Sequence, residues 1–101
     1  MYSFIVPKQL DNWFLTLKNK LNNVSFAMDN DINLDESEWI DKSKWKVYIT
    51  TNIGDDKIFR TSPVIEFKEE LNQVITVNGG IYLLKTPLNN SQLTNLKKIF
   101  Y

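Results

Sequence analysis

The chain has 101 residues, the size of one small domain. Its 12 basic and 12 acidic residues balance, so no general attraction to nucleic acid or to an anionic membrane is expected. The absence of cysteine and histidine excludes disulfides, zinc–thiolate sites and His-based catalytic triads within this chain. The sequence shows no signal peptide and no apolar run of membrane-spanning length. We therefore expect a single soluble, cytoplasmic domain over residues 1–101.

The N-terminal segment predicts an amphipathic helix over residues 7–22. Its apolar residues recur at the i, i+3, i+4 and i+7 spacing of one helix face, and Pro7 suits a first helical turn. Asn22 and Asn23 end the pattern. The predicted core-facing stripe consists of Leu10, Trp13, Phe14, Leu17 and Leu21.

Most of the remaining chain predicts strands, because apolar and polar residues alternate between turn-forming clusters. Within residues 73–85, two β-rich runs flank Asn78-Gly79, which favours a hairpin with a type I′ turn. The other predicted strands are residues 24–28, 44–51, 57–61 and 63–68.

The last segment predicts a second amphipathic helix, capped by Asn90 or Ser91. Lys97 and Lys98 suit its C-terminal turn through the helix dipole. Its apolar stripe is Leu93, Leu96, Ile99 and Phe100. The order of elements predicts class α+β: an antiparallel sheet of four to six strands, with the N-terminal and C-terminal amphipathic helices packed on one face.

Residues 29–41 carry six acids and no base. Oxygen-bearing side chains follow the alternate spacing of a calcium-binding EF-hand loop. However, Leu34 stands where that loop needs glycine, and Ile40 stands where it needs a bidentate glutamate. We therefore expect no metal and no other cofactor. Asp35 and Glu38 have capping-box spacing, which predicts a short helix around residues 36–42.

An acidic surface of this kind steers a basic partner, and a tryptophan among charges makes a good interface anchor. We expect a small non-catalytic protein that binds another protein, such as a basic or nucleic-acid-binding one, with a homodimer also compatible. The plainer interpretation of Trp39 is that it docks the short helix onto the core. The predicted protein-binding residues are Asp31, Asp35, Glu36, Glu38, Trp39 and Asp41.

The composition is rich in Lys, Asn and Ile, with one arginine, which is typical of an A+T-rich genome. An inhibitor of a host enzyme, encoded by a phage or another mobile element, is the sharpest form of the protein-binding hypothesis.

The alternative hypothesis is a single-stranded nucleic-acid-binding module. Basic residues alternate with an aromatic residue from residue 42 into the predicted strand 44–51, so they share one sheet face, where such an arrangement can bind single strands. The adjacent acidic run would repel phosphate, and a solvent-facing sheet normally carries lysine. The residues of this hypothesis are Lys42, Lys44, Lys46, Tyr48 and Arg60.

Catalysis is not expected. Five further carboxylates lie in or near predicted turns, where solvation explains them, and none is paired with a base or placed across a predicted cleft. These residues are Asp55, Asp56, Glu66, Glu69 and Glu70.

Overall fold

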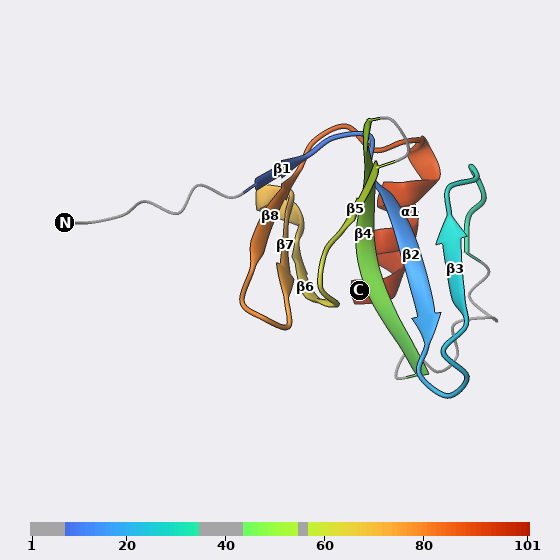
Figure 1. The fold of residues 1–101 in the computed structure, drawn as a ribbon. Coiled ribbons are helices and arrows are strands. Elements are labelled where there is room, and N and C mark those ends of the chain that lie inside the picture. The colour runs from blue at the N-terminus through green and yellow to red at the C-terminus, as the bar shows by residue number, and fades with distance from the viewer. Residues whose placement is uncertain (1–7, 35–43, 55–56) are drawn as a thin grey trace.

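In a computed structural model, the chain forms two four-stranded β-sheets and a C-terminal helix (Figure 1). The structure describes residues 8–34, 44–54 and 57–101. Strands are the dominant element. None of the helices in these ranges is long and apolar enough to cross a membrane.

The first sheet has the strand order β1-β8-β7-β6. Strand β1 pairs in parallel with β8, whereas the other two pairings are antiparallel. A single 3-10 turn, Glu69–Leu71, joins β6 to β7 and ends at Asn72, whose φ of 49° is left-handed. The strands are β1 (Lys8–Leu10), β6 (Val64–Lys68), β7 (Gln73–Thr76) and β8 (Ile81–Leu84).

The second sheet has the order β3-β2-β4-β5, and all its pairings are antiparallel. Helix α1 (Asn90–Phe100) lies behind this sheet in Figure 1 and packs against β2 and β6. One face of the second sheet therefore meets the helix, and its opposite face is turned toward the viewer. The strands are β2 (Phe14–Asn19), β3 (Ser25–Met28), β4 (Trp45–Gly54) and β5 (Lys57–Arg60).

A single cluster of buried apolar side chains joins both sheets to α1. Its residues from β2 and β4 lie on the helix side of the second sheet, and Phe67 and Val74 come from the first sheet. Leu96 and Ile99 of α1 close the cluster, as the predicted apolar stripe requires. The cluster contains no residue from the opposite, outer face of the second sheet.

The predicted N-terminal helix over residues 7–22 is wrong: the described part of this segment forms β1, β2 and a turn. Leu15, Thr16 and Leu17 are all buried, so side chains pack on both faces of β2. Asn12 has a φ of 50°, a left-handed conformation that interrupts any helix. The helical spacing had combined residues that the fold places on two different strands.

Leu21 shows the same error, because it was assigned to the core stripe and is 78% exposed. It lies in the turn between β2 and β3. The Asn19 side chain accepts a hydrogen bond from the Leu21 N–H at 2.8 Å, and that of Asn22 accepts one from the Val24 N–H at 3.0 Å. Asparagine side chains stabilise turns in this way, so the Asn-rich stretch makes a hairpin rather than ending a helix.

The predicted α+β arrangement is therefore corrected to a mostly β fold. The single antiparallel sheet with two helices on one face is replaced by two sheets, one with a parallel pair, and by α1 as the one α-helix among the described residues. The predicted strand 24–28 is confirmed as β3, the predicted strands from residue 44 onward are confirmed as β4 to β8, and the predicted C-terminal helix is α1. The predicted short helix around residues 36–42 lies outside the described residues.

The hairpin between β7 and β8 is confirmed, with a different turn. Thr76 accepts a hydrogen bond from the Gly79 N–H at 2.9 Å and donates its own N–H to Gly80 at 2.9 Å. Gly79 has a φ of 81°, whereas Asn78 is not among the residues with positive φ. A type I′ turn needs positive φ at both positions, so the loop is instead a three-residue connection with a left-handed glycine.

Candidate binding face on the second sheet

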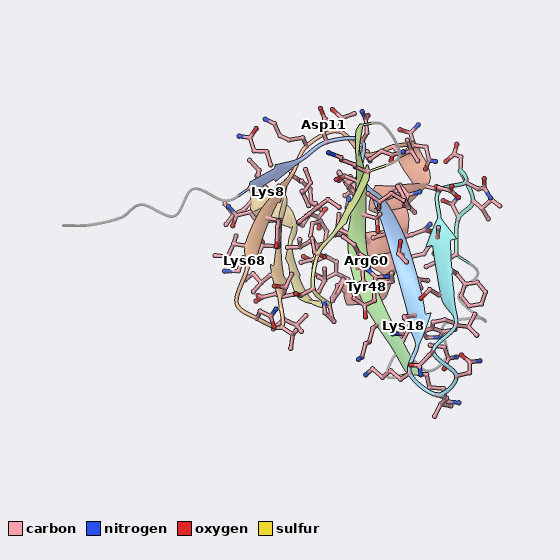
Figure 2. All side chains as sticks on the ribbon, in the orientation of Figure 1. Lys8, Asp11, Lys18, Tyr48, Arg60 and Lys68 are labelled. Carbon is pink, nitrogen blue, oxygen red and sulfur yellow. The ribbon has the colours of Figure 1, made fainter. Side chains whose placement is uncertain are left out.

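The strand register gathers basic side chains on the outer face of the second sheet (Figure 2). Lys18 lies opposite Lys46, and Thr16 lies opposite Tyr48. Thr50 lies opposite both Phe14 on β2 and Arg60 on β5. We call this surface the basic face; it comprises Phe14, Thr16, Lys18, Ala27, Lys46, Tyr48, Thr50, Ile58 and Arg60.

The charges on the basic face are not balanced within its own sheet. The sequences of β2, β3, β4 and β5 contain no acidic residue. Lys18 and Lys46 face each other directly across neighbouring strands, an arrangement of like charges that destabilises a sheet. No ion pair joins either lysine to a residue that the structure describes. A bound anion would relieve this repulsion.

Arg60 covers Tyr48 at the centre of the basic face. Its guanidinium carbon lies 4.6 Å from the centre of the Tyr48 ring, within the range of a cation–π contact. Tyr48 is only 7% exposed, so its ring is a support for Arg60 rather than an open platform. The guanidinium thereby gains a fixed position, although Arg60 itself remains exposed.

A hollow of about 360 Å³ adjoins Arg60 on this face. Phe14, Ala27 and Ile58 supply apolar walls. The hydroxyls of Thr16 and Thr50 meet at 2.7 Å within it, and both residues are buried. An apolar hollow beside a guanidinium suits a ligand that combines a flat ring with a neighbouring negative group.

The first part of the acidic segment has a structural role, because it is bound to α1. The Asp31 carboxylate accepts a hydrogen bond from the Ser91 N–H at 3.1 Å, at the N-terminus of α1. Unpaired N–H groups and the helix dipole favour a carboxylate there. Farther along α1, the Asn95 carboxamide donates to Ile32 and accepts from Leu34 at 2.9 and 2.8 Å. Residues 29–34 are thus tied to the helix.

Of the predicted protein-binding residues, the structure describes Asp31 alone. Asp31 is exposed but engaged with Ser91. The other five, Asp35, Glu36, Glu38, Trp39 and Asp41, lie outside the described residues. Within the ranges that the structure describes, no cluster of three or more acidic side chains has the arrangement of a metal site.

The structure describes all of the predicted nucleic-acid-binding residues except Lys42. Lys46, Tyr48 and Arg60 do share the basic face. Lys44 is exposed, and its carbonyl accepts a hydrogen bond from the Lys20 N–H at 2.8 Å; Lys42 lies outside the described residues. Sequence reasoning missed Lys18, which it had placed on a helix. The alternation of Phe14, Thr16 and Lys18 with Leu15 and Leu17 was the available signal for a strand.

A larger hollow, of about 500 Å³, lies between β6 and the end of α1. Its lining mixes Glu66, Lys68 and Glu70 with apolar groups, so its charges do not favour one class of ligand.

We found no match for the chain among protein-family models, curated proteins or solved structures.

Proposed function

We propose that the chain is a non-catalytic module that binds single-stranded nucleic acid on the basic face. The observation that carries this proposal is the acid-free sheet on which Lys18 and Lys46 oppose each other beside Arg60. Phosphate groups supply the anions that this arrangement lacks. Basic and aromatic groups interleaved on a sheet are a recurrent solution for single strands.

Each part of the basic face has a separate task in this proposal. Lys18 and Lys46 contact phosphates. Arg60, whose guanidinium carbon lies 4.6 Å from the centre of the Tyr48 ring, offers its outer side for stacking, because nucleobases stack on guanidinium planes as well as on aromatic rings. The hollow beside it receives a base against Phe14 and Ile58. Stacking and phosphate contacts carry little sequence information, so we expect weak sequence preference.

The test uses a fluorescently labelled pyrimidine oligonucleotide of about 10 nucleotides, a length within the usual single-strand site sizes. We expect log K to fall with log salt concentration at a slope of roughly −1.4, for the phosphate contacts of Lys18 and Lys46. Lys18→Ala and Lys46→Ala should each weaken binding roughly eightfold at about 50 mM salt, as the loss of one phosphate contact implies. Arg60→Lys keeps the positive charge but should still weaken binding, because lysine has no planar group that can stack on a base.

Lys85→Ala is the matched control, since Lys85 is exposed just after β8 and far from the basic face in the strand order. It should leave the affinity within about twofold of wild type. If Lys85→Ala lowered the affinity as much as Lys46→Ala does, binding would depend on the overall charge of the protein and not on the basic face. Absence of binding at low salt would reject the proposal outright.

A second proposal is protein binding through the acidic segment. One observation favours it: Ile32 is 62% exposed between Asp31 and Asn33. An exposed apolar residue in an acidic setting is a suitable contact for a basic partner protein. Inhibition of a host enzyme by a mobile-element protein is the specific form of this proposal.

The protein-binding proposal is tested by affinity purification from host cells with charge reversal at Asp35, Glu36 and Glu38. One specific partner should be retained by wild type and lost by the reversed variant. Reversal at Glu66, Glu69 and Glu70 is the matched control, because it changes the same number of carboxylates elsewhere on the surface. Retention of the partner by both variants would show that the acidic segment is not the interface.

A further inference from the structure

We propose that the edge of β3, which pairs with no further strand among the described residues, pairs with β3 of a second copy of the chain, in antiparallel orientation, to make one continuous sheet. Strand β3 is the outermost strand of the second sheet. Ser25, Phe26 and Ala27 are all exposed. The Asn19 N–H donates to the Val24 carbonyl, one position beyond the paired residues of β2 and β3. Because bonded pairs alternate along an antiparallel ladder, the backbone groups of Ser25 and Ala27 point away from β2.

The other sheet edges carry features that hinder such pairing. β5 has Lys57 and Arg60, and its ladder with β4 shifts register. β6 has a register shift next to Glu66, and β1 begins with Lys8. Charges and bulges are common means of blocking edge-to-edge association. β3, with the sequence SFAM, carries no charge, and its paired residues show no register shift.

A second copy of β3 is a suitable occupant, because the strand carries no charge and exposes Phe26 at its middle. Its outward-pointing backbone groups belong to Ser25 and Ala27, which flank Phe26 evenly. A two-fold axis beside Phe26 therefore sets Ser25 opposite Ala27 of the second copy, as a hydrogen-bonded pair in both directions. The same register sets Phe26 opposite its own copy and Val24 opposite Met28. Two identical strands thus match group for group.

The side chains also suit this register. Val24 and Phe26 are 43% and 50% exposed, and the Phe26 ring already contacts Trp45 at 5.8 Å between centroids. Antiparallel pairing would cover these apolar groups on one side of the sheet and leave only Ser25 and Ala27 on the other. Aromatic residues directly opposite each other stabilise an antiparallel pair. No like charges meet, because β3 has none.

The consequence is a sheet in which the two basic faces lie on the same side. The dimer does not depend on nucleic-acid binding, and either proposal can fail without the other. β3 has four residues, so the interface is small and the association is expected to be weak and reversible.

The first test is disulfide trapping, which the absence of cysteine makes clean. In Phe26→Cys, the two thiols meet in a non-hydrogen-bonded pair, with Cα atoms about 4.5 Å apart, within reach of a disulfide. In Val24→Cys, the two thiols are four positions out of register, roughly 14 Å apart at the usual strand rise, too far to bridge. Phe26→Cys should form a covalent dimer under mild oxidation, and Val24→Cys should not.

The second test measures mass by sedimentation equilibrium, up to about 1 mM protein, where weak association becomes visible. Wild type should dimerise reversibly. Phe26→Lys and Phe26→Glu should each be monomeric, and their mixture should form the heterodimer, because opposite charges then face each other. Ile65→Lys, at a residue that is 58% exposed on β6, should dimerise like wild type.

Ala27→Pro provides an independent variant, because proline is tolerated where a strand N–H points away from its sheet. It should keep the fold by circular dichroism and lose dimerisation. The proposal is overturned if wild type stays monomeric throughout, if Phe26→Lys dimerises normally, or if Val24→Cys crosslinks as readily as Phe26→Cys. A wild-type monomer whose β3 amide signals shift with an uncharged extended peptide would also overturn it, and would identify a peptide as the occupant.

Discussion

The side-chain oxygen of Gln92 accepts a hydrogen bond from the backbone N–H of Leu15 at 2.9 Å, and both residues are fully buried. The nitrogen of the same carboxamide donates to the carbonyl of Met28. Leu15 and Met28 are partners in the ladder between β2 and β3. One side chain of α1 therefore satisfies a donor and an acceptor on two neighbouring strands, and it links the helix to the sheet.

Replacing Gln92 by alanine should be strongly destabilising. The Leu15 N–H and the Met28 carbonyl would both lose a partner, and each unsatisfied buried group costs about 1–3 kcal/mol. We expect a loss of about 2–4 kcal/mol in the free energy of unfolding, measured by urea denaturation. Gln9→Ala, on the exposed surface of β1, should change it by less than about 0.5 kcal/mol. Equal effects of the two substitutions would contradict the bridging role.

Asp31 should act as a helix cap and not as a calcium ligand. Asp31→Ala removes the acceptor for the Ser91 N–H and should lower stability by about 0.5–1 kcal/mol. Asp31→Asn keeps an acceptor and should lower it less. Millimolar calcium should leave the melting temperature of wild type unchanged, because a ligand stabilises only the state that it binds. A calcium-dependent rise that Asp31→Ala abolishes would contradict this assignment.

Thr16 and Thr50 should be energetically coupled, because their hydroxyls bond only to each other among the described hydrogen bonds. Thr16→Val or Thr50→Val leaves one buried hydroxyl without its partner, at a cost of about 1–2 kcal/mol. The double substitution removes both groups and should cost less than the sum of the two. A double-mutant cycle by chemical denaturation measures the coupling, and additive effects would show that the hydroxyls act independently.

Substitutions at Leu15 and Leu21 distinguish most directly between the observed strand and a helix over residues 7–22. Leu15 is fully buried and Leu21 is 78% exposed, whereas a helix over residues 7–22 would bury Leu21. Leu15→Ala should cost about 2–5 kcal/mol through lost burial and a cavity. Leu21→Ala should cost less than about 0.5 kcal/mol. The two unfolding free energies, compared under the same conditions, distinguish these folds.

The candidate site divides between what alternation predicts and what strand pairing creates. Lys46 and Tyr48 share a face because they are two residues apart on one strand, and that relation was predictable. Their approach to Lys18 and Arg60 depends on the registers of β2 and β5 with β4. Pairing partners and register are non-local, so local periodicity could not supply them. The position of Arg60 over Tyr48 is a result of the same pairing.

The sequence by itself determined β3, the strands from residue 44 onward, the β7–β8 hairpin and α1, because alternation, a glycine turn and an amphipathic stripe are local signals. Only the tertiary structure decided that residues 8–19 form β1 and β2 rather than a helix. There the burial of Leu15, Thr16 and Leu17 on two faces of one sheet overrides a spacing that also fits a helix. The attachment of residues 29–34 to α1 was likewise decided in three dimensions, since Asn95 and Asp31 find partners more than 50 positions away along the chain.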